Sequence, residues 1–153
     1  MDKLERKIPP VALFVLFIVA SNQLSHEFLT FQVNLPLAGL LFALCFVVAG
    51  FVGLAGIYEF RRAQTTVSPI KVDDASTVVD SGIYSYTRNP MYLGLFVLLF
   101  GYAYWQQNLL AIVFSFGFIV YMNRFQILPE ERALEALFGS QYLDYKQRVR
   151  RWI

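Results

Sequence analysis

The sequence has only one cysteine, Cys45, and one histidine, His26. A single cysteine excludes an internal disulfide and a cysteine-based metal cluster, and its apolar neighbours indicate a small buried hydrophobic side chain. No Ser-His-Asp or Cys-His set can be assembled, no cluster of metal-ligating residues is present, and no P-loop or Gly-x-Gly-x-x-Gly motif follows a predicted strand. The sequence therefore argues against hydrolases, metalloenzymes and Rossmann dehydrogenases, and no metal is expected.

Charged residues are also scarce. They make up 16% of the 153 residues, whereas 57% are hydrophobic and 17% are aromatic. This composition is typical of membrane proteins rather than of soluble domains. The net charge of +2 is too small to indicate a nucleic-acid partner. Because the length corresponds to one domain, we expect residues 1–153 to form a single integral membrane domain.

Four apolar segments reach or approach the roughly 20 residues that a helix needs to cross a bilayer. A tight antiparallel hairpin is expected for the last two, because only three residues, QQN, separate them. The first segment has a second interpretation as a signal peptide, since basic residues precede a short apolar run. The sequence predicts an all-α, polytopic membrane helix bundle with about four spans, near residues 8–25, 35–60, 91–105 and 109–128.

The basic residues indicate how the bundle is oriented. All 13 Lys and Arg precede the first segment, lie between the second and third, or follow the apolar core of the fourth. Neither residues 26–34 nor the QQN turn contains one. By the positive-inside rule, both termini are expected in the cytoplasm. His26 then lies on the outer side, where we expect it to be solvated and remote from catalysis.

The second apolar segment carries small residues four positions apart, Gly39 with Ala43 and Ala49 with Gly53. This spacing allows another helix backbone to approach closely. We expect helix packing here, and the alternative is a groove for a lipid tail.

Two polar segments are predicted on the cytoplasmic side. The loop at residues 61–89 is rich in β-formers and aromatics, and we expect it to be ordered. Further on, Pro129 followed by two glutamates predicts the start of a helix, and Gly139 predicts its end. A second short helix would then end in the basic sequence RVRRWI, which suits a helix lying on an anionic leaflet. Its apolar face would consist of Tyr142, Tyr145 and Val149.

Taken singly, these features have structural explanations. Glu130 and Glu131 are placed to complement a helix dipole. Tyr84, Tyr86 and Tyr92 fit an aromatic belt at the membrane interface. The functional interpretation therefore depends on the features in combination.

Two motifs in the second half of the chain resemble one enzyme family. The first is RNPMYLG at residues 88–94, and the second is PEERALEALFGSQYLDYKQRV at residues 129–149. Together they resemble the isoprenylcysteine carboxyl methyltransferase and phospholipid methyltransferase superfamily of integral membrane enzymes. The resemblance covers roughly residues 65–151.

This resemblance implies a cofactor and a site. Members of the family bind S-adenosylmethionine between the loop before the hairpin and the segment after it, here residues 76–94 and 124–149, and methylate a lipophilic substrate. Both segments lie on the predicted cytoplasmic side, where S-adenosylmethionine is found. Matched by position, the cofactor-binding residues are Thr77, Val78, Val79, Tyr84, Arg88, Asn89, Pro90, Met91, Tyr92, Glu130 and Glu131.

Two positions depart from the family pattern. Asn89 replaces the histidine of the first motif. Gln126 stands where isoprenylcysteine enzymes carry an arginine for the substrate carboxylate, and Arg124 lies two residues earlier. We assign Arg124 and Gln126 to the substrate. The acceptor is left open between an isoprenylcysteine-type carboxylate and a phospholipid amine, and no residue is assigned as a general base.

The expected partners are the lipid bilayer and a lipophilic or lipid-anchored substrate, with no nucleic acid and no obligate protein partner. The expected location is the inner membrane of a bacterium or an archaeon. Two other functions are alternatives to methyl transfer. One is an NADPH enzyme of the sterol-reductase type, whose C-terminal region resembles this fold but whose chain is much longer. The other is a non-catalytic membrane adaptor with a degenerate pocket.

Overall fold

The computed structural model describes residues 5–64 and 76–153. These residues are helical and contain no strand, which confirms the all-α prediction; an isolated bridge joins Gln32 to Asn108. Residues 65–75, which belong to the predicted loop, lie outside the described residues. The elements in order are α1 (Pro10–Glu27), η1 (Leu29–Phe31), α2 (Ala38–Arg62), η3 (Gly82–Ser85), α3 (Pro90–Trp105), α4 (Leu109–Tyr121), the π-helical turn η4 (Met122–Ile127), α5 (Leu128–Phe138) and α6 (Ser140–Arg148).

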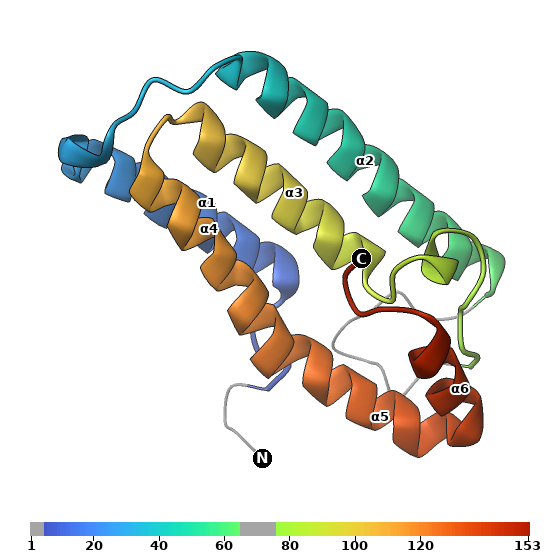
Figure 1. The fold of residues 1–153 in the computed structure, drawn as a ribbon. Coiled ribbons are helices and arrows are strands. Elements are labelled where there is room, and N and C mark those ends of the chain that lie inside the picture. The colour runs from blue at the N-terminus through green and yellow to red at the C-terminus, as the bar shows by residue number, and fades with distance from the viewer. Residues whose placement is uncertain (1–4, 65–75) are drawn as a thin grey trace.

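Helices α2 and α3 run side by side (Figure 1) and approach closely through small residues. A Cβ added at Gly94 of α3 would lie 3.0 Å from the Ala49 carbonyl oxygen and 3.7 Å from the Gly53 Cα on α2. The predicted packing at Ala49 and Gly53 is therefore confirmed. The same prediction is wrong for Gly39 and Ala43. No atom lies within 4 Å of a Cβ added at Gly39, and Ala43 is exposed.

Cys45 also belongs to this helix pair. A Cβ added at Gly101 would lie 2.5 Å from the Cys45 Cβ, so the thiol-bearing residue packs against a glycine of α3. The side chain is partly rather than fully buried, which corrects the prediction of a buried residue. It faces α3 on one side and the outside of the bundle on the other.

The predicted hairpin between α3 and α4 is confirmed (Figure 1). Asn108 is fully buried and caps α4, because its Oδ1 accepts from the backbone N–H groups of Leu110 and Ala111 at 3.0 and 3.2 Å. The Asn108 Nδ2 donates to the Phe28 carbonyl at 3.0 Å. One side chain thus starts a helix and holds the end of α1 to the turn.

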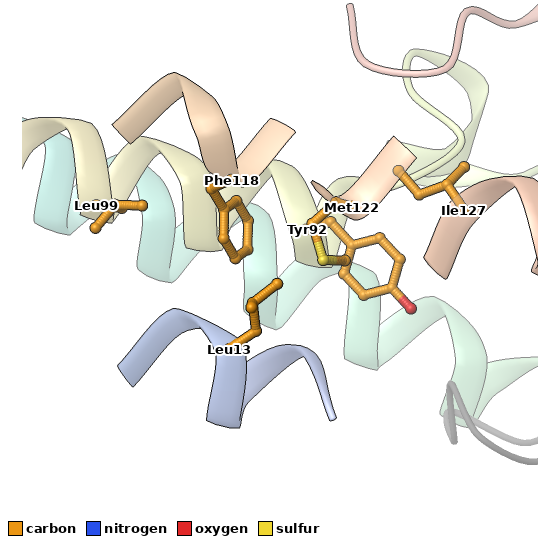
Figure 2. Close-up of a cluster of buried hydrophobic side chains, with 6 residues drawn as sticks. All are labelled: Leu13, Tyr92, Leu99, Phe118, Met122 and Ile127. Carbon is orange, nitrogen blue, oxygen red and sulfur yellow. The ribbon is translucent and has the colours of Figure 1, made fainter. Parts of the chain in front are cut away.

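An apolar core fills the space between α1, α3 and the helix that follows α3 (Figure 2). Aromatic contacts extend it, since the Phe17 ring stacks on Phe114 at 4.8 Å and meets Phe118 edge-on at 5.7 Å. At the end nearer α5 the core includes Tyr92, so it reaches a residue of the predicted site. The six core residues are Leu13, Tyr92, Leu99, Phe118, Met122 and Ile127.

The outer surface of the bundle is apolar. Among the described residues, two helices are long and apolar enough to cross a membrane: α2, and the continuous helix over Leu109–Phe138. Only 17% of the apolar stretch of α2 is buried, and large exposed apolar surfaces on folded proteins mark contact with lipid or with partners. The exposed side chains of α2 include Leu40, Leu44, Val47, Phe51 and Leu54.

Pro129 lies in the first turn of α5, as predicted, but no break precedes this helix, because α4 continues through the π-helical turn into α5 as one helix of 30 residues. Proline has no N–H, so Pro129 cannot donate to the carbonyl four residues earlier. That carbonyl, at Phe125, instead accepts from the backbone N–H of Arg6 at 2.9 Å. The N-terminal segment thereby supplies the hydrogen bond that proline removes.

The end of the chain also differs from the prediction. Gly139 has a φ of +54° between α5 and α6 and confirms the predicted helix end. The apolar face of α6 is buried as predicted. However, α6 stops at Arg148, and residues 149–153 are not helical. They cross to the start of α3 (Figure 1) rather than forming a helix that lies on a membrane surface.

Candidate functional site

The two predicted halves of the site meet at the end of the bundle that carries α5 and α6 (Figure 1). The first half consists of residues 76–89 and the start of α3. The second consists of the π-helical turn and α5. Their meeting point is the carboxylate of Glu130, whose Oε1 accepts from the Tyr92 hydroxyl at 2.6 Å.

Glu130 is held inside the protein by neutral donors. The residue is 9% exposed, and its Oε1 accepts from the Gln126 amide as well as from Tyr92. Gln126 and Glu130 are four residues apart on one helix, so their side chains share a face. Both donors bind the same oxygen, so among the described residues Oε2 has no donor. A buried carboxylate with an open acceptor position is suited to a cationic group.

Glu131 has different surroundings, although it is the next residue. Its Oε1 accepts from Arg88 at 2.7 Å, and Arg151 donates to both oxygens at 3.0 and 2.7 Å. Lys146 lies 3.8 Å from Oε2. The Glu131 side chain is 4% exposed and that of Arg88 is 8% exposed. Glu131 is therefore neutralised by cations of this chain.

Asn89 and Thr87 contact the end of the chain. The Asn89 Nδ2 donates to the Arg151 carbonyl at 2.9 Å, and the Thr87 hydroxyl donates to the same oxygen at 3.4 Å. The backbone N–H of Asn89 donates to the Thr87 Oγ1 at 3.2 Å. These contacts fix the backbone just before Pro90 begins α3.

An aromatic cluster forms the wall next to these polar groups. Tyr84 is 4% exposed, and its ring meets Phe60 of α2 edge-on at 5.1 Å. The Tyr145 hydroxyl of α6 donates to the Tyr84 carbonyl at 2.8 Å. Burial raises the pKa of the Tyr84 hydroxyl far above its ordinary value, and Tyr145 and Glu130 raise it further. The Tyr84 hydroxyl therefore remains protonated and is available as a donor.

The loop is also fastened to α2 by Glu59, a buried acid. The Ser81 hydroxyl donates to Glu59 Oε2 at 2.5 Å. Gly82 follows with a φ of +55°, and a Cβ at this position would collide with the Glu59 side chain. Glu59 is not among the residues predicted for the site. The signal was available, because a single acid within an apolar helix is costly unless it has a partner.

The other residues predicted for the cofactor line the loop and the first turn of α3. Val79 is buried with Tyr84, Tyr142 and Tyr145, and Val78 packs against this cluster. Pro90 is buried, whereas Thr77 and Met91 are partly buried. These residues therefore surround the aromatic wall on the loop side. Whether they contact a cofactor stays a prediction.

The two residues predicted for the substrate point to different places. Gln126 is buried beside Glu130. Arg124 has a side chain that is 49% exposed, and its guanidinium lies 3.5 Å from the Glu5 carboxylate. Arg132 pairs with the same carboxylate at 2.8 Å. The structure therefore brings only Gln126 to the buried carboxylate, and Arg124 faces the N-terminal segment.

Comparison with known proteins adds an independent observation. The family model described as phospholipid methyltransferase matches residues 37–141. An uncharacterized protein of Haemophilus influenzae is 46% identical over 63 residues, which is 41% of this chain and all of that protein. No solved structure gives a significant match.

Two named enzymes are similar over part of their length. A protein-S-isoprenylcysteine O-methyltransferase of Xenopus laevis is 38% identical over 79 residues, or 50% of this chain and 26% of the enzyme. The Saccharomyces cerevisiae enzyme of the same name is 29% identical over 116 residues, or 69% of this chain and 47% of the enzyme. The matched regions thus cover between a quarter and half of these enzymes.

Proposed function

Because the chain belongs to the phospholipid methyltransferase family, we propose that it transfers a methyl group from S-adenosylmethionine to a lipophilic acceptor in the membrane. The observation that carries the proposal is Glu130. Its carboxylate is buried where the two motif halves meet, and among the described residues its second oxygen has no donor.

The residues at this place fit the proposed cofactor. S-adenosylmethionine carries a sulfonium and an amino group, both cationic, and a buried carboxylate with neighbouring tyrosines is suited to hold such groups. When bound, the cofactor supplies an electrophilic methyl group. Glu130 would bind the cationic part, Tyr84 would donate its protonated hydroxyl, and the remaining contacts would come from Thr77, Val78, Val79, Asn89, Pro90, Met91 and Tyr92.

The chain's own part in such a transfer is alignment and the exclusion of water. Tyr92 and Gln126 fix the Glu130 carboxylate from one side, so its free oxygen has a defined direction. Tyr92 also belongs to the apolar core, which links the site to the membrane-facing part of the bundle. A methyl transfer requires an aligned and desolvated acceptor more than a catalytic base. The lack of an assigned base is consistent with this chemistry.

We further propose four spans with both termini in the cytoplasm. The described basic residues support this orientation, because those of α2, α5 and α6 and of the segments next to them gather at the end with Glu130. The opposite end consists of residues 28–37 and the turn after α3, which contain no Lys or Arg. The exposed and apolar faces of α1 and α4 would then contact lipid.

A ligand-binding experiment tests the proposal directly. The purified chain in detergent is titrated with S-adenosylhomocysteine, and NADPH serves as the comparison ligand for a sterol-reductase type of enzyme. A ligand at about 100 times its Kd stabilises the folded state by about 2.7 kcal/mol, so thermal unfolding reports binding. Stabilisation by S-adenosylhomocysteine alone is expected. Stabilisation by NADPH alone would favour the reductase, and no response to either ligand would favour an adaptor.

The acceptor is identified by a second experiment. The chain is incubated with isotopically labelled S-adenosylmethionine and a total membrane lipid extract, and the labelled products are analysed by mass spectrometry. Label on a lipid amine or on a lipid carboxylate distinguishes the two acceptor classes.

A further inference from the structure

The last five residues, 149–153, here called the C-terminal tail, lie across the start of α3 (Figure 1). The backbone N–H of Arg88 donates to the Arg150 carbonyl at 3.0 Å, and Asn89 and Thr87 donate to the Arg151 carbonyl. At the end of the tail, the Trp152 Nε1 donates to the Asn123 Oδ1 of the π-helical turn at 3.0 Å. The tail is therefore bonded to both halves of the site.

Side chains strengthen this connection. Arg151 of the tail donates to both carboxylate oxygens of Glu131 on α5, and Arg88 of the loop donates to one of them. Arg88 also donates through its second terminal nitrogen to the carbonyls of Lys146 and Val149, at 2.9 and 2.7 Å. Three segments that are distant in sequence thus meet at one carboxylate. We call the group of Arg88, Glu131 and Arg151 the tail clamp.

The clamp contains Arg88 and Glu131, which the family resemblance assigns to the cofactor. Both oxygens of Glu131 and both terminal nitrogens of Arg88 are bonded to other parts of this chain. Glu131 is nevertheless the neighbour of Glu130, and Arg88 comes directly before residues 89–92. A bond between Arg88 and Glu131 therefore fixes the distance between the two halves that would hold the cofactor.

We propose that Arg151 is a positioning residue, which locks the loop half of the cofactor site against the helix half through the tail clamp. This inference rests on the proposed function. Arginine is required because its planar guanidinium binds a carboxylate through two parallel hydrogen bonds, which lysine cannot reproduce. Since the Glu131 carboxylate is buried, loss of one cation leaves its charge incompletely paired and opens the clamp.

The test compares Arg151→Ala, Arg151→Lys and Arg148→Ala in the full chain. Arg148 is the matched control, because it lies three residues earlier and forms an exposed ion pair with Asp80 at 3.1 Å. We expect Arg151→Ala to weaken S-adenosylhomocysteine binding by roughly tenfold or more, since the buried Glu131 carboxylate loses its bidentate partner, the partly exposed Arg151. We expect Arg151→Lys to restore part of the affinity and Arg148→Ala to leave it unchanged. Amide hydrogen exchange at residues 87–92 should rise in Arg151→Ala without ligand.

Two controls separate positioning from general stability. Phe42→Leu removes a ring that stacks on Trp105 at 5.6 Å, at the end of α3 opposite to the site, and it should lower Tm while leaving the affinity unchanged. If Arg151→Ala does not fold, Arg151→Lys carries the test through its several-fold weaker binding. Two results would overturn the clamp. One is unchanged amide hydrogen exchange at residues 87–92 in Arg151→Ala, and the other is wild-type affinity for S-adenosylhomocysteine in Arg151→Ala or in Arg151→Lys. If the wild type does not bind the ligand, the proposed function fails, and the exchange measurement still decides whether the clamp exists.

Discussion

Glu130 and Glu131 are adjacent in the chain, but their carboxylates meet different partners. Glu131 is bonded to two arginines from other segments, whereas Glu130 is bonded to a tyrosine and a glutamine. The difference follows from the helix, on which successive side chains point about 100° apart. One carboxylate therefore faces the tail, and the other faces the interior of the site.

This difference predicts the effect of Glu130→Gln. Removal of a charge that binds a cationic ligand should weaken S-adenosylhomocysteine binding by roughly ten- to a hundredfold. The affinity is measured by calorimetry in detergent. Glu135→Gln is the control, because Glu135 lies on the same helix and pairs with Lys146 at the surface. Equal affinities in the two variants would show that Glu130 acts only on the helix dipole.

Much of the site is predictable at the scale of residues, since the two motifs select the residues that meet at Tyr92 and Glu130. The partners of Glu131 were not predicted. The basic sequence around Arg151 predicts a lipid-binding end, because a sequence shows that a residue is basic but not which acid it meets. Its pairing depends on the path of the chain after α6, which no local pattern specifies.

At the scale of elements, the contact between α2 and α3 depends on the absence of side chains at glycines. Gly94→Ala places a methyl group 3.0 Å from the Ala49 carbonyl oxygen, and overpacking of this kind costs about 1–3 kcal/mol. Thermal unfolding in detergent measures the effect. The matched control is Gly39→Ala on α2, where a Cβ meets no atom within 4 Å. This variant should be neutral or up to about 1 kcal/mol more stable because alanine favours the helix. Equal melting temperatures would contradict close packing at Gly94.

The helices themselves are predictable because their apolar length and their turn residues are local properties. The π-helical turn is not. It precedes Pro129, which removes one hydrogen bond, and the carbonyl that is left open at Phe125 accepts from Arg6. A partner more than a hundred residues away in the sequence therefore allows one continuous helix where proline alone suggests a helix start.

At the scale of the whole molecule, the distribution of charge predicts the topology. With Cys45 replaced by alanine, single cysteines at the exposed positions Thr30 and Asp144 report the two sides of the membrane. Thr30→Cys should react with an impermeant maleimide in intact cells. Asp144→Cys should react only after the membrane is permeabilised. Reaction of both from the same side would exclude the proposed orientation.

The single helix over Leu109–Phe138 has a geometric consequence. Leu109 and Glu130 are 21 positions apart in the chain (130 − 109). At about 1.5 Å per residue this separation is about 31 Å along the axis, and slightly less because the rise per residue is smaller in the π-helical turn. The hydrocarbon core of a bilayer is about 30 Å thick. In the proposed topology, the length of this helix would place the Glu130 carboxylate at the inner membrane surface when Leu109 lies at the outer one. Under the proposed function, an acceptor would have to present its reactive group at that depth while its chains remain among the lipids, and molecules that lie deeper or shallower would be excluded by position alone.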